Sequence, residues 1–212
     1  MTASYDTIAA DSGVLDRLSE RRCIIHNGVV GLRISARRTL ANVEAIFQGP
    51  SPRVMEDGRN IHISVPRFRT MMHELCMGSE TGWSDLKLPS VSPWDVVIHG
   101  GVADLEVDML ESTLNGLTIH GGAVNVDIVL PAPTSRISID IHGGCNNVRI
   151  LRPHGSDLGM AIHGGCTGMK LDNWNAAAQG KPFTWLSGPS MNRYDVNIHG
   201  GVTDMEVATF RE

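Results

Sequence analysis

The sequence predicts an all-β protein built as a single parallel β-solenoid (β-helix) of about seven rungs, and three observations lead to this prediction. The tetrapeptide Ile-His-Gly-Gly occurs five times, and successive copies start 21, 22, 21 and 36 residues apart. Apolar residues alternate on both sides of each copy, which is the pattern of a strand with one buried face. The chain contains 23 glycines, which suit tight turns and are costly inside helices.

Each repeat of 21–22 residues is expected to contain a strand, a Gly-Gly corner and a second strand. Two short strands cannot bury an apolar face alone, so the repeats should stack in register and form a continuous core. The second strands, from Leu105 to Met205, should line another wall of this core, and the usual crossover preference predicts a right-handed coil. The isoleucines expected to stack on the first wall are Ile98, Ile119, Ile141, Ile162 and Ile198.

The expected organisation is a short N-terminal segment followed by one solenoid. Residues 1–22 form the segment, and a helix over 11–20 would cap the first rung. Residues 23–212 form the solenoid, which is interrupted twice. Residues 67–92 are irregular because they do not fit the period. Residues 173–193 are expected to form an inserted, protruding loop, because Pro and Gly punctuate them.

The repeats resemble a group of uncharacterised bacterial Gly-Gly-repeat proteins. The resemblance rests on Pro-Trp-Asp at 93–95, on the apolar-x-Gly-Gly-small pattern of the repeats, and on Tyr-Asp-x-x-Ile-x-Gly-Gly at 194–201. More loosely, the chain is similar to the bacterial putative-adhesin domains and to the bactofilins, which are β-solenoids. The likeness covers Cys23 to Val207 and implies a fold, but no catalytic residues. The uniform His before Gly-Gly departs from the group.

Composition argues against several classes of protein. Hydrophobic residues make up 42% and charged residues 19% of the chain, as in globular proteins. The formal charge is −5 and no basic stripe stands out, so no nucleic-acid partner is expected. No run of about 18 apolar residues occurs, so no membrane span is expected. The first 22 residues lack the parts of a secretion signal, so a cytoplasmic location is expected.

The histidines of the repeated motif are the candidates for a catalytic site. Strands in a parallel sheet lie about 4.8 Å apart, so the rings should stack as a ladder. The ladder is either structural, or it binds a ligand or substrate with one His as acid or base. No metal is expected, because a straight row offers mainly two adjacent ligands. The candidates are His99, His120, His142, His163 and His199.

Other side chains divide into candidates and structural residues. Trp174, Phe183 and Trp185 are candidates for ligand binding, since they either cover the side of the solenoid or close a pocket. Cys145 and Cys166 share one repeat position and are expected to be small buried residues rather than a disulfide. The acidic residues are interpreted as a solvated face that forms no single column. They include Asp104, Glu106, Asp127, Asp172 and Asp204.

The predicted function is a scaffold, or a self-assembling or binding module, without catalysis. Its support is regularity, because rung geometry explains nearly every position. The last repeat leaves little sequence for a cap, so its open edge is expected to pair with a second copy. The alternative is an enzyme or small-molecule binder that uses the stacked histidines or a pocket under the aromatic segment. No cofactor is expected.

Overall fold

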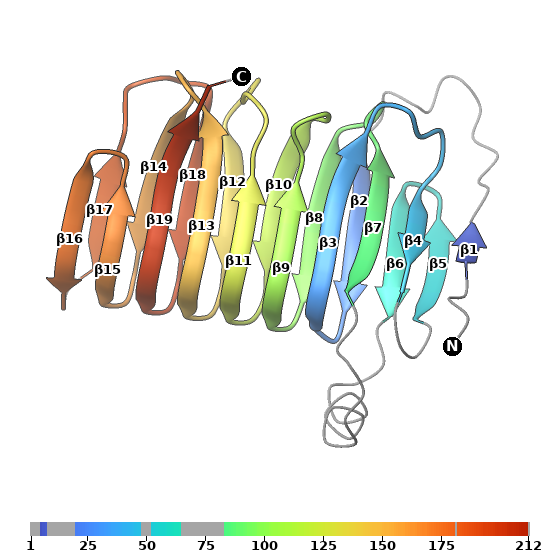
Figure 1. Cartoon of the computed structure of the whole chain (residues 1–212), viewed down its shortest axis with the longest axis horizontal. Helices are drawn as coiled ribbons and strands as arrows, with labels where there is room; N and C mark the ends of the chain where they lie inside the picture. The colour runs from blue at the N-terminus through green and yellow to red at the C-terminus, as the bar shows by residue number, and fades with distance from the viewer. Residues whose placement is uncertain (1–4, 8–19, 48–51, 65–82, 181, 212) are drawn as a thin grey trace.

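The computed structural model describes residues 5–7, 20–47, 52–64, 83–180 and 182–211. Its described strands form two sheets that lie face to face (Figure 1). In spatial order, sheet A contains β1 (Tyr5–Thr7), β4 (Glu44–Ile46), β7 (Ser84–Pro89), β3 (Val29–Arg37), β9 (Val102–Asp108), β11 (Ala123–Val129), β13 (Cys145–Pro153), β19 (Val202–Phe210), β15 (Cys166–Leu171) and β16 (Trp174–Gln179). Sheet B contains β17 (Phe183–Leu186), β14 (Asp157–Ile162), β18 (Arg193–Ile198), β12 (Ile137–Ile141), β10 (Leu114–Ile119), β8 (Trp94–His99), β2 (Arg21–His26), β6 (Asn60–Ser64) and β5 (Arg53–Asp57).

The all-β prediction is confirmed, but the prediction of a single parallel β-solenoid is wrong. Both sheets are mixed. At one end β16 pairs antiparallel with β15, and β17 pairs antiparallel with β14. At the other end β4 runs antiparallel to both β7 and β1, and β5 runs antiparallel to β6. Parallel strands therefore fill only the middle of each sheet, and antiparallel pairs lie at both ends (Figure 1).

The spatial order of the strands also departs from their order in the chain. The last pair, β18 and β19, lies between β12–β13 and β14–β15. Likewise β2 and β3 lie between β6–β7 and β8–β9. A solenoid adds its turns in chain order, so these strands are not one continuous coil. The last repeat is consequently no open edge, because β19 pairs with β13 on one side and with β15 on the other.

The core lies between the two sheets and follows the alternation of the sequence. The five motif isoleucines are at most 1% exposed, and each pairs in register with the next one along sheet B. The second wall consists of one repeat position on successive strands of sheet A, which begins with Leu105 and ends with Met205 in the chain. It is buried to the same degree. Two large polar-tipped side chains are also buried: Trp94 Nε1 donates to the Pro89 carbonyl at 2.8 Å, and Tyr194 Oη donates to the Pro131 carbonyl at 2.8 Å.

The Gly-Gly corners join sheet B to sheet A along the lower edge in Figure 1. Successive corners touch through their backbones, and the Gly143 amide donates to the Gly121 carbonyl at 3.0 Å. A Cβ added to Gly143 would lie 2.5 Å from the backbone nitrogen of Gly122. Glycine is therefore required here chiefly because the next corner leaves no room for a side chain. Among the first glycines of the five motifs, only Gly100 has a positive φ, of 134°.

Several sequence-based expectations concern particular segments. The helix over 11–20 falls on residues outside the described part of the chain, apart from Glu20, and so does the stretch 67–82. The remainder of 67–92 contains β7, and the segment 173–193 contains β16 and β17.

The cysteines within the described residues are buried and free, as expected, and burial raises the pKa of the Cys145 thiol to about 12. The described residues include no helix of the length and apolarity that a membrane crossing requires.

Candidate functional site

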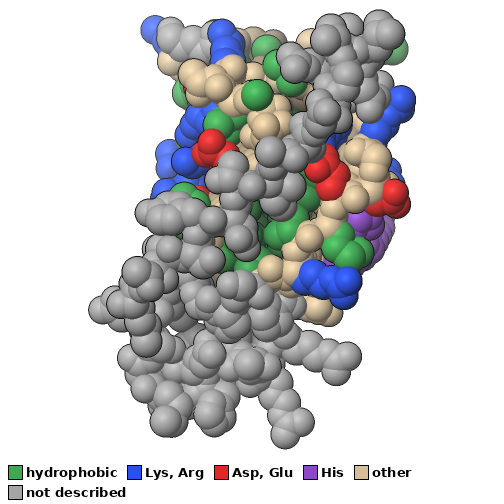
Figure 2. Space-filling model, turned by 90° about the vertical axis from the view of Figure 1, so that its right-hand side faces the viewer, with side chains coloured by type: hydrophobic (Ala, Val, Ile, Leu, Met, Phe, Trp, Pro, Cys, Tyr) green, Lys and Arg blue, Asp and Glu red, His purple; other side chains and the backbone are tan. Residues whose placement is uncertain are grey.

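Seven histidines form one row on the outer side of sheet B, beside the Gly-Gly corners. Neighbouring rings stack with centroids 4.8–5.5 Å apart and with interplanar angles of 1–14°. Figure 2, which looks along the sheets from the β1 and β5 end, shows histidines gathered on one flank. From that end, the histidine row consists of His62, His26, His99, His120, His142, His199 and His163.

The histidine row contains all five candidates from the repeated motif, but not in chain order. His199 lies between His142 and His163, because β18 is inserted between β12 and β14. Two members were not among the candidates. His26 occupies the same position in a degenerate copy of the motif, whereas His62 precedes no glycine and gave no signal. The described residues contain no group of three or more His, Cys, Asp or Glu side chains arranged to hold a metal ion.

The surroundings of His99 in the row lower its pKa. Partial burial lowers the pKa of His99, and the neighbouring rings of His120 and His26 lower it further. A proton on His99 therefore costs more in the folded protein than in the unfolded chain. The rings of the row remain accessible to solvent at the five motif histidines, which are exposed.

Acid is expected to destabilise the protein through His99. Since the pKa of His99 is lowered from 6.5 on folding, the unfolded chain binds more protons just below that pH. The contribution of the neutral His99 ring to stability is complete above the pKa that His99 has in the unfolded chain. It is lost as pH falls through that pKa. Melting temperatures between about pH 7.5 and 5 should therefore fall more steeply for the wild type than for His99→Asn. His154→Asn, an exposed histidine outside the row, is the control, and equal slopes for His99→Asn and the wild type would contradict the prediction.

The three aromatic candidates lie on the reversed strands at one end of the molecule. The rings of Trp174 and Phe183 stack with centroids 5.2 Å apart. Phe183 and Trp185 are partly buried against the hydrophobic core, and Trp174 is 38% exposed. In this position the side chains pack over the end of the core.

A groove of about 480 Å³ crosses the outer face of sheet A over β9, β11, β13, β19 and β15. Along it, each strand contributes a residue with positive φ at the same repeat position. The φ angles are 53° at Asp104, 53° at Asn125, 52° at Asn147 and 53° at Asp204, and Gly168 follows with 63°. Asn, Asp and Gly are the residues that adopt this conformation most readily. Such a residue interrupts regular strand pairing, as a bulge does.

The polar side chains of this position form a hydrogen-bonded row in the groove. Asn147 Nδ2 donates to Asn125 Oδ1 at 3.0 Å, and Asn125 Nδ2 donates to Asp104 Oδ1 at 2.9 Å. Register places Asp204 opposite Asn147 on the next strand. A Cβ on Gly168 would clash with the Asp204 carboxylate, which leans over that glycine. The groove polar row therefore consists of Asp104, Asn125, Asn147 and Asp204.

Charged residues flank the groove polar row at the position two residues further along each strand. In spatial order they are Asp85, Arg33, Glu106, Asp127, Arg149, Glu206 and Lys170. Arg33 Nε bonds to Glu106 Oε2 at 2.6 Å, and Arg149 Nε lies 3.7 Å from Glu206 Oε2. These pairs are solvent-exposed, so each contributes at most about 1 kcal/mol to stability. Their main effect is on the charge that a ligand meets.

Comparison with known proteins shows a likeness in fold. No family model and no curated protein matches the chain. A crystal structure of a putative cell adhesion protein from Clostridium sporogenes ATCC 15579 superimposes with a TM-score of 0.65 at 15% sequence identity. The match covers 99% of this chain and 100% of that one. At this identity the likeness shows the fold alone, and it is consistent with the loose similarity to the adhesin domains.

The groove was missed by sequence reasoning, although a signal was present. The acidic residues form no single column, as expected, but they are not scattered, because Asp104 and Asp204 lie in one column, and Glu106, Asp127 and Glu206 lie in the next. The signal was an Asn, Asp or Gly three residues after the second glycine of every motif. That regularity is typical of a position with positive φ.

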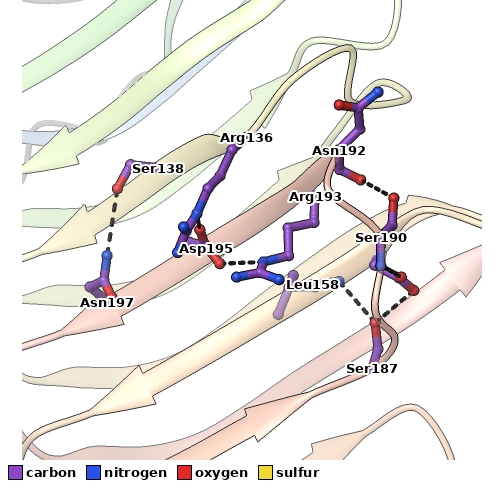
Figure 3. A network of polar contacts seen from close by, with 10 residues as sticks. Arg136, Ser138, Leu158, Ser187, Ser190, Asn192, Arg193, Asp195 and Asn197 are labelled. Carbon is purple, nitrogen blue, oxygen red and sulfur yellow. Dashed lines mark hydrogen bonds and ion pairs between the residues drawn. The ribbon is translucent and has the colours of Figure 1, made fainter.

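A second polar network, on sheet B, is structural (Figure 3). Asp195 accepts hydrogen bonds from Arg136 and from Arg193 Nε, the latter at 2.8 Å. Although burial acts in the opposite direction, these two arginines lower the pKa of Asp195. Further along, Asp157 accepts from Ser187 and from the Ser190 amide. The network ties the connection after β17 to β14 and β18.

Proposed function

We propose that this chain is a binding module without catalysis, and that the groove of sheet A holds an extended, uncharged, polyhydroxylated polymer such as a polysaccharide. The observation behind the proposal is the groove polar row, in which Asp104, Asn125 and Asn147 are joined by hydrogen bonds of 2.9–3.0 Å. It presents the same polar contact on successive strands. The groove crosses five strands, so it extends for about 20 Å.

The chemistry of the row suits hydroxyl groups. A hydroxyl both donates and accepts, an amide offers both functions, and a carboxylate accepts only. The hydrogen bonds within the row use one donor of each amide, so each asparagine keeps a second N–H. The strand spacing of about 4.8 Å is comparable with the length of one sugar unit in an extended glycan. Successive units of such a polymer can therefore make equivalent contacts.

The charge of the groove favours a neutral ligand over a polyanion. Its lining contains five carboxylates, from Asp104, Glu106, Asp127, Asp204 and Glu206, and two cationic side chains. An excess of carboxylates repels phosphate-rich polymers, which bind through cationic side chains.

An aromatic side chain completes the groove at one end. Trp83 lines it, is 36% exposed and is oriented by Arg33, whose guanidinium carbon lies 5.6 Å from its ring centroid. An exposed indole can pack against the apolar face of a sugar ring while its N–H stays available for hydrogen bonding.

The fold likeness to a putative cell adhesion protein is compatible with a binding role. Association of copies through the ends of the sheets stays a prediction, and those ends are formed by β16 and β17 or by β1 and β5.

Removing two amides from the groove is expected to weaken binding without unfolding the protein. The variant is Asn125→Gly with Asn147→Gly, because Gly accepts φ angles of 53° and 52° without strain. Affinity electrophoresis in gels containing xylan, galactomannan or hydroxyethyl cellulose should retard the wild type. The double variant should bind at least about tenfold more weakly.

The control is His142→Asn, which changes the outer side of sheet B and should bind like the wild type. Equal retardation of the double variant and the wild type would exclude the groove polar row as the binding site. A wild type that none of the three polysaccharides retards would count against the proposal itself.

A further inference from the structure

We propose that His26, His62 and Met55 form a copper-binding site at one end of the histidine row. The site lies on the outer side of sheet B, so it is separate from the groove and independent of the proposed function. Its central observation is that Nε2 of His26 and Nδ1 of His62 lie 3.2 Å apart. The two rings belong to adjacent parallel strands, β2 and β6, and their planes are nearly parallel, with an interplanar angle of 7° and centroids 5.5 Å apart.

The two nitrogens face each other across the gap between the rings. A separation of 3.2 Å with the ring centroids 5.5 Å apart places both nitrogens on the line between the rings, so their lone pairs lie along one axis. Imidazole nitrogens bind first-row transition metals at about 2.0–2.1 Å, so an ion between them needs the nitrogens about 4 Å apart. Without metal, one ring donates its N–H to the other. A metal ion takes the place of that shared proton once the two rings move apart by about 0.9 Å, since ligating imidazoles are neutral.

The third ligand comes from the neighbouring edge strand. β5 pairs antiparallel with β6 and places Met55 directly opposite His62. Side chains opposite each other in such a pair share one face, with Cβ atoms about 4.5–5.5 Å apart. Val54 packs against the core, so Met55 is directed outward, and it is 48% exposed. Its exposed thioether, opposite His62, is a soft donor.

The ligand set selects the metal. Imidazole binds zinc, nickel and copper, whereas a thioether favours copper(I) over zinc. His26 and His62 are only partly buried, so solvent can reach the remaining coordination positions. A bound ion would join β5, β6 and β2, and so hold the edge strand of sheet B in place.

The test measures copper(I) affinity on untagged protein under anaerobic conditions, in competition with bicinchoninate. The wild type should withdraw one equivalent of copper(I). His26→Asn and His62→Asn should each weaken binding at least about tenfold, and Met55→Leu should do the same. Zinc affinity, measured by calorimetry, should fall in the two histidine variants and stay unchanged in Met55→Leu. His163→Asn, at the opposite end of the row, is the matched control and should behave like the wild type.

The outcomes that overturn the proposal are distinct. A wild type that takes no copper, or histidine variants that bind as tightly as the wild type, would exclude the site. A loss in His163→Asn equal to that in His62→Asn would show that the row binds copper without a preferred position. An unchanged copper affinity in Met55→Leu would remove the thioether and with it the selectivity for copper. Metal-free melting curves establish that each variant is folded, and His62→Gln replaces His62→Asn if that variant is not.

Discussion

Replacing Ile141 with Asp is expected to unfold the protein under conditions in which the wild type is stable. Ile141 is fully buried on β12, between Ile119 of β10 and Ile198 of β18. A carboxylate there would lose its hydration and find only aliphatic neighbours. The cost should exceed about 4 kcal/mol, a large fraction of the 5–15 kcal/mol that stabilises a typical domain.

Chemical denaturation followed by circular dichroism measures this effect. Ile141→Val is the matched control, because it removes one methylene at the same position and should cost only about 1 kcal/mol. If Ile141→Asp kept a denaturation midpoint close to that of Ile141→Val, the side chain could not face the core as described.

The second large effect is expected at the corners, where Gly143→Val should cost about 3 kcal/mol or more. A Cβ on Gly143 would lie 2.5 Å from the nitrogen and 2.6 Å from the Cα of Gly122, and neither atom can move alone. The corner is hydrogen-bonded on both sides, since the Gly143 amide donates to Gly121 at 3.0 Å and its carbonyl accepts from Gly200 at 3.1 Å. Relief of the clash would therefore displace three neighbouring corners.

Denaturant midpoints of Gly143→Val and Gly180→Ala test this explanation. A Cβ on Gly180 meets no atom within 4 Å, so Gly180→Ala should change stability by less than about 0.5 kcal/mol. Similar midpoints for the two variants would show that the corners tolerate side chains, and the reason given for the repeated glycines would fail.

The sequence determines the parts of this fold that depend on local pattern. Alternation placed Ile98 and Leu105 in the core, and the Gly-Gly pairs marked the corners correctly, because both follow from the geometry of a single repeat. The order of the repeats could not be predicted in this way. All repeats carry the same residue types at the same positions, so any two of them fit side by side. The reversed strands β16 and β17 lack the repeat pattern altogether.

The candidate sites, too, were predictable where they depend on a single repeat and not where they depend on which strands pair. The motif histidines share one repeat position, so their common face was predictable, whereas His62 joins the row only because β6 pairs with β2. The groove depends on the positive φ of residues such as Asn125, which a search for catalytic or metal-binding residues overlooks. Its lining also combines strands far apart in the chain, since β19 separates β13 from β15.

The insertion of β18 and β19 between earlier strands has a consequence for biosynthesis. As the chain leaves the ribosome, β14 and β15 emerge before the two strands that connect them to the rest of the sheets. Until then, β14 and β15 can pair with β12 and β13 only in a non-native arrangement. The side chains in that arrangement match in type because the repeats are alike. The nascent protein must therefore keep these strands apart or exchange them when the last repeat arrives. Such rearrangement of non-local pairings is slow compared with the formation of local structure.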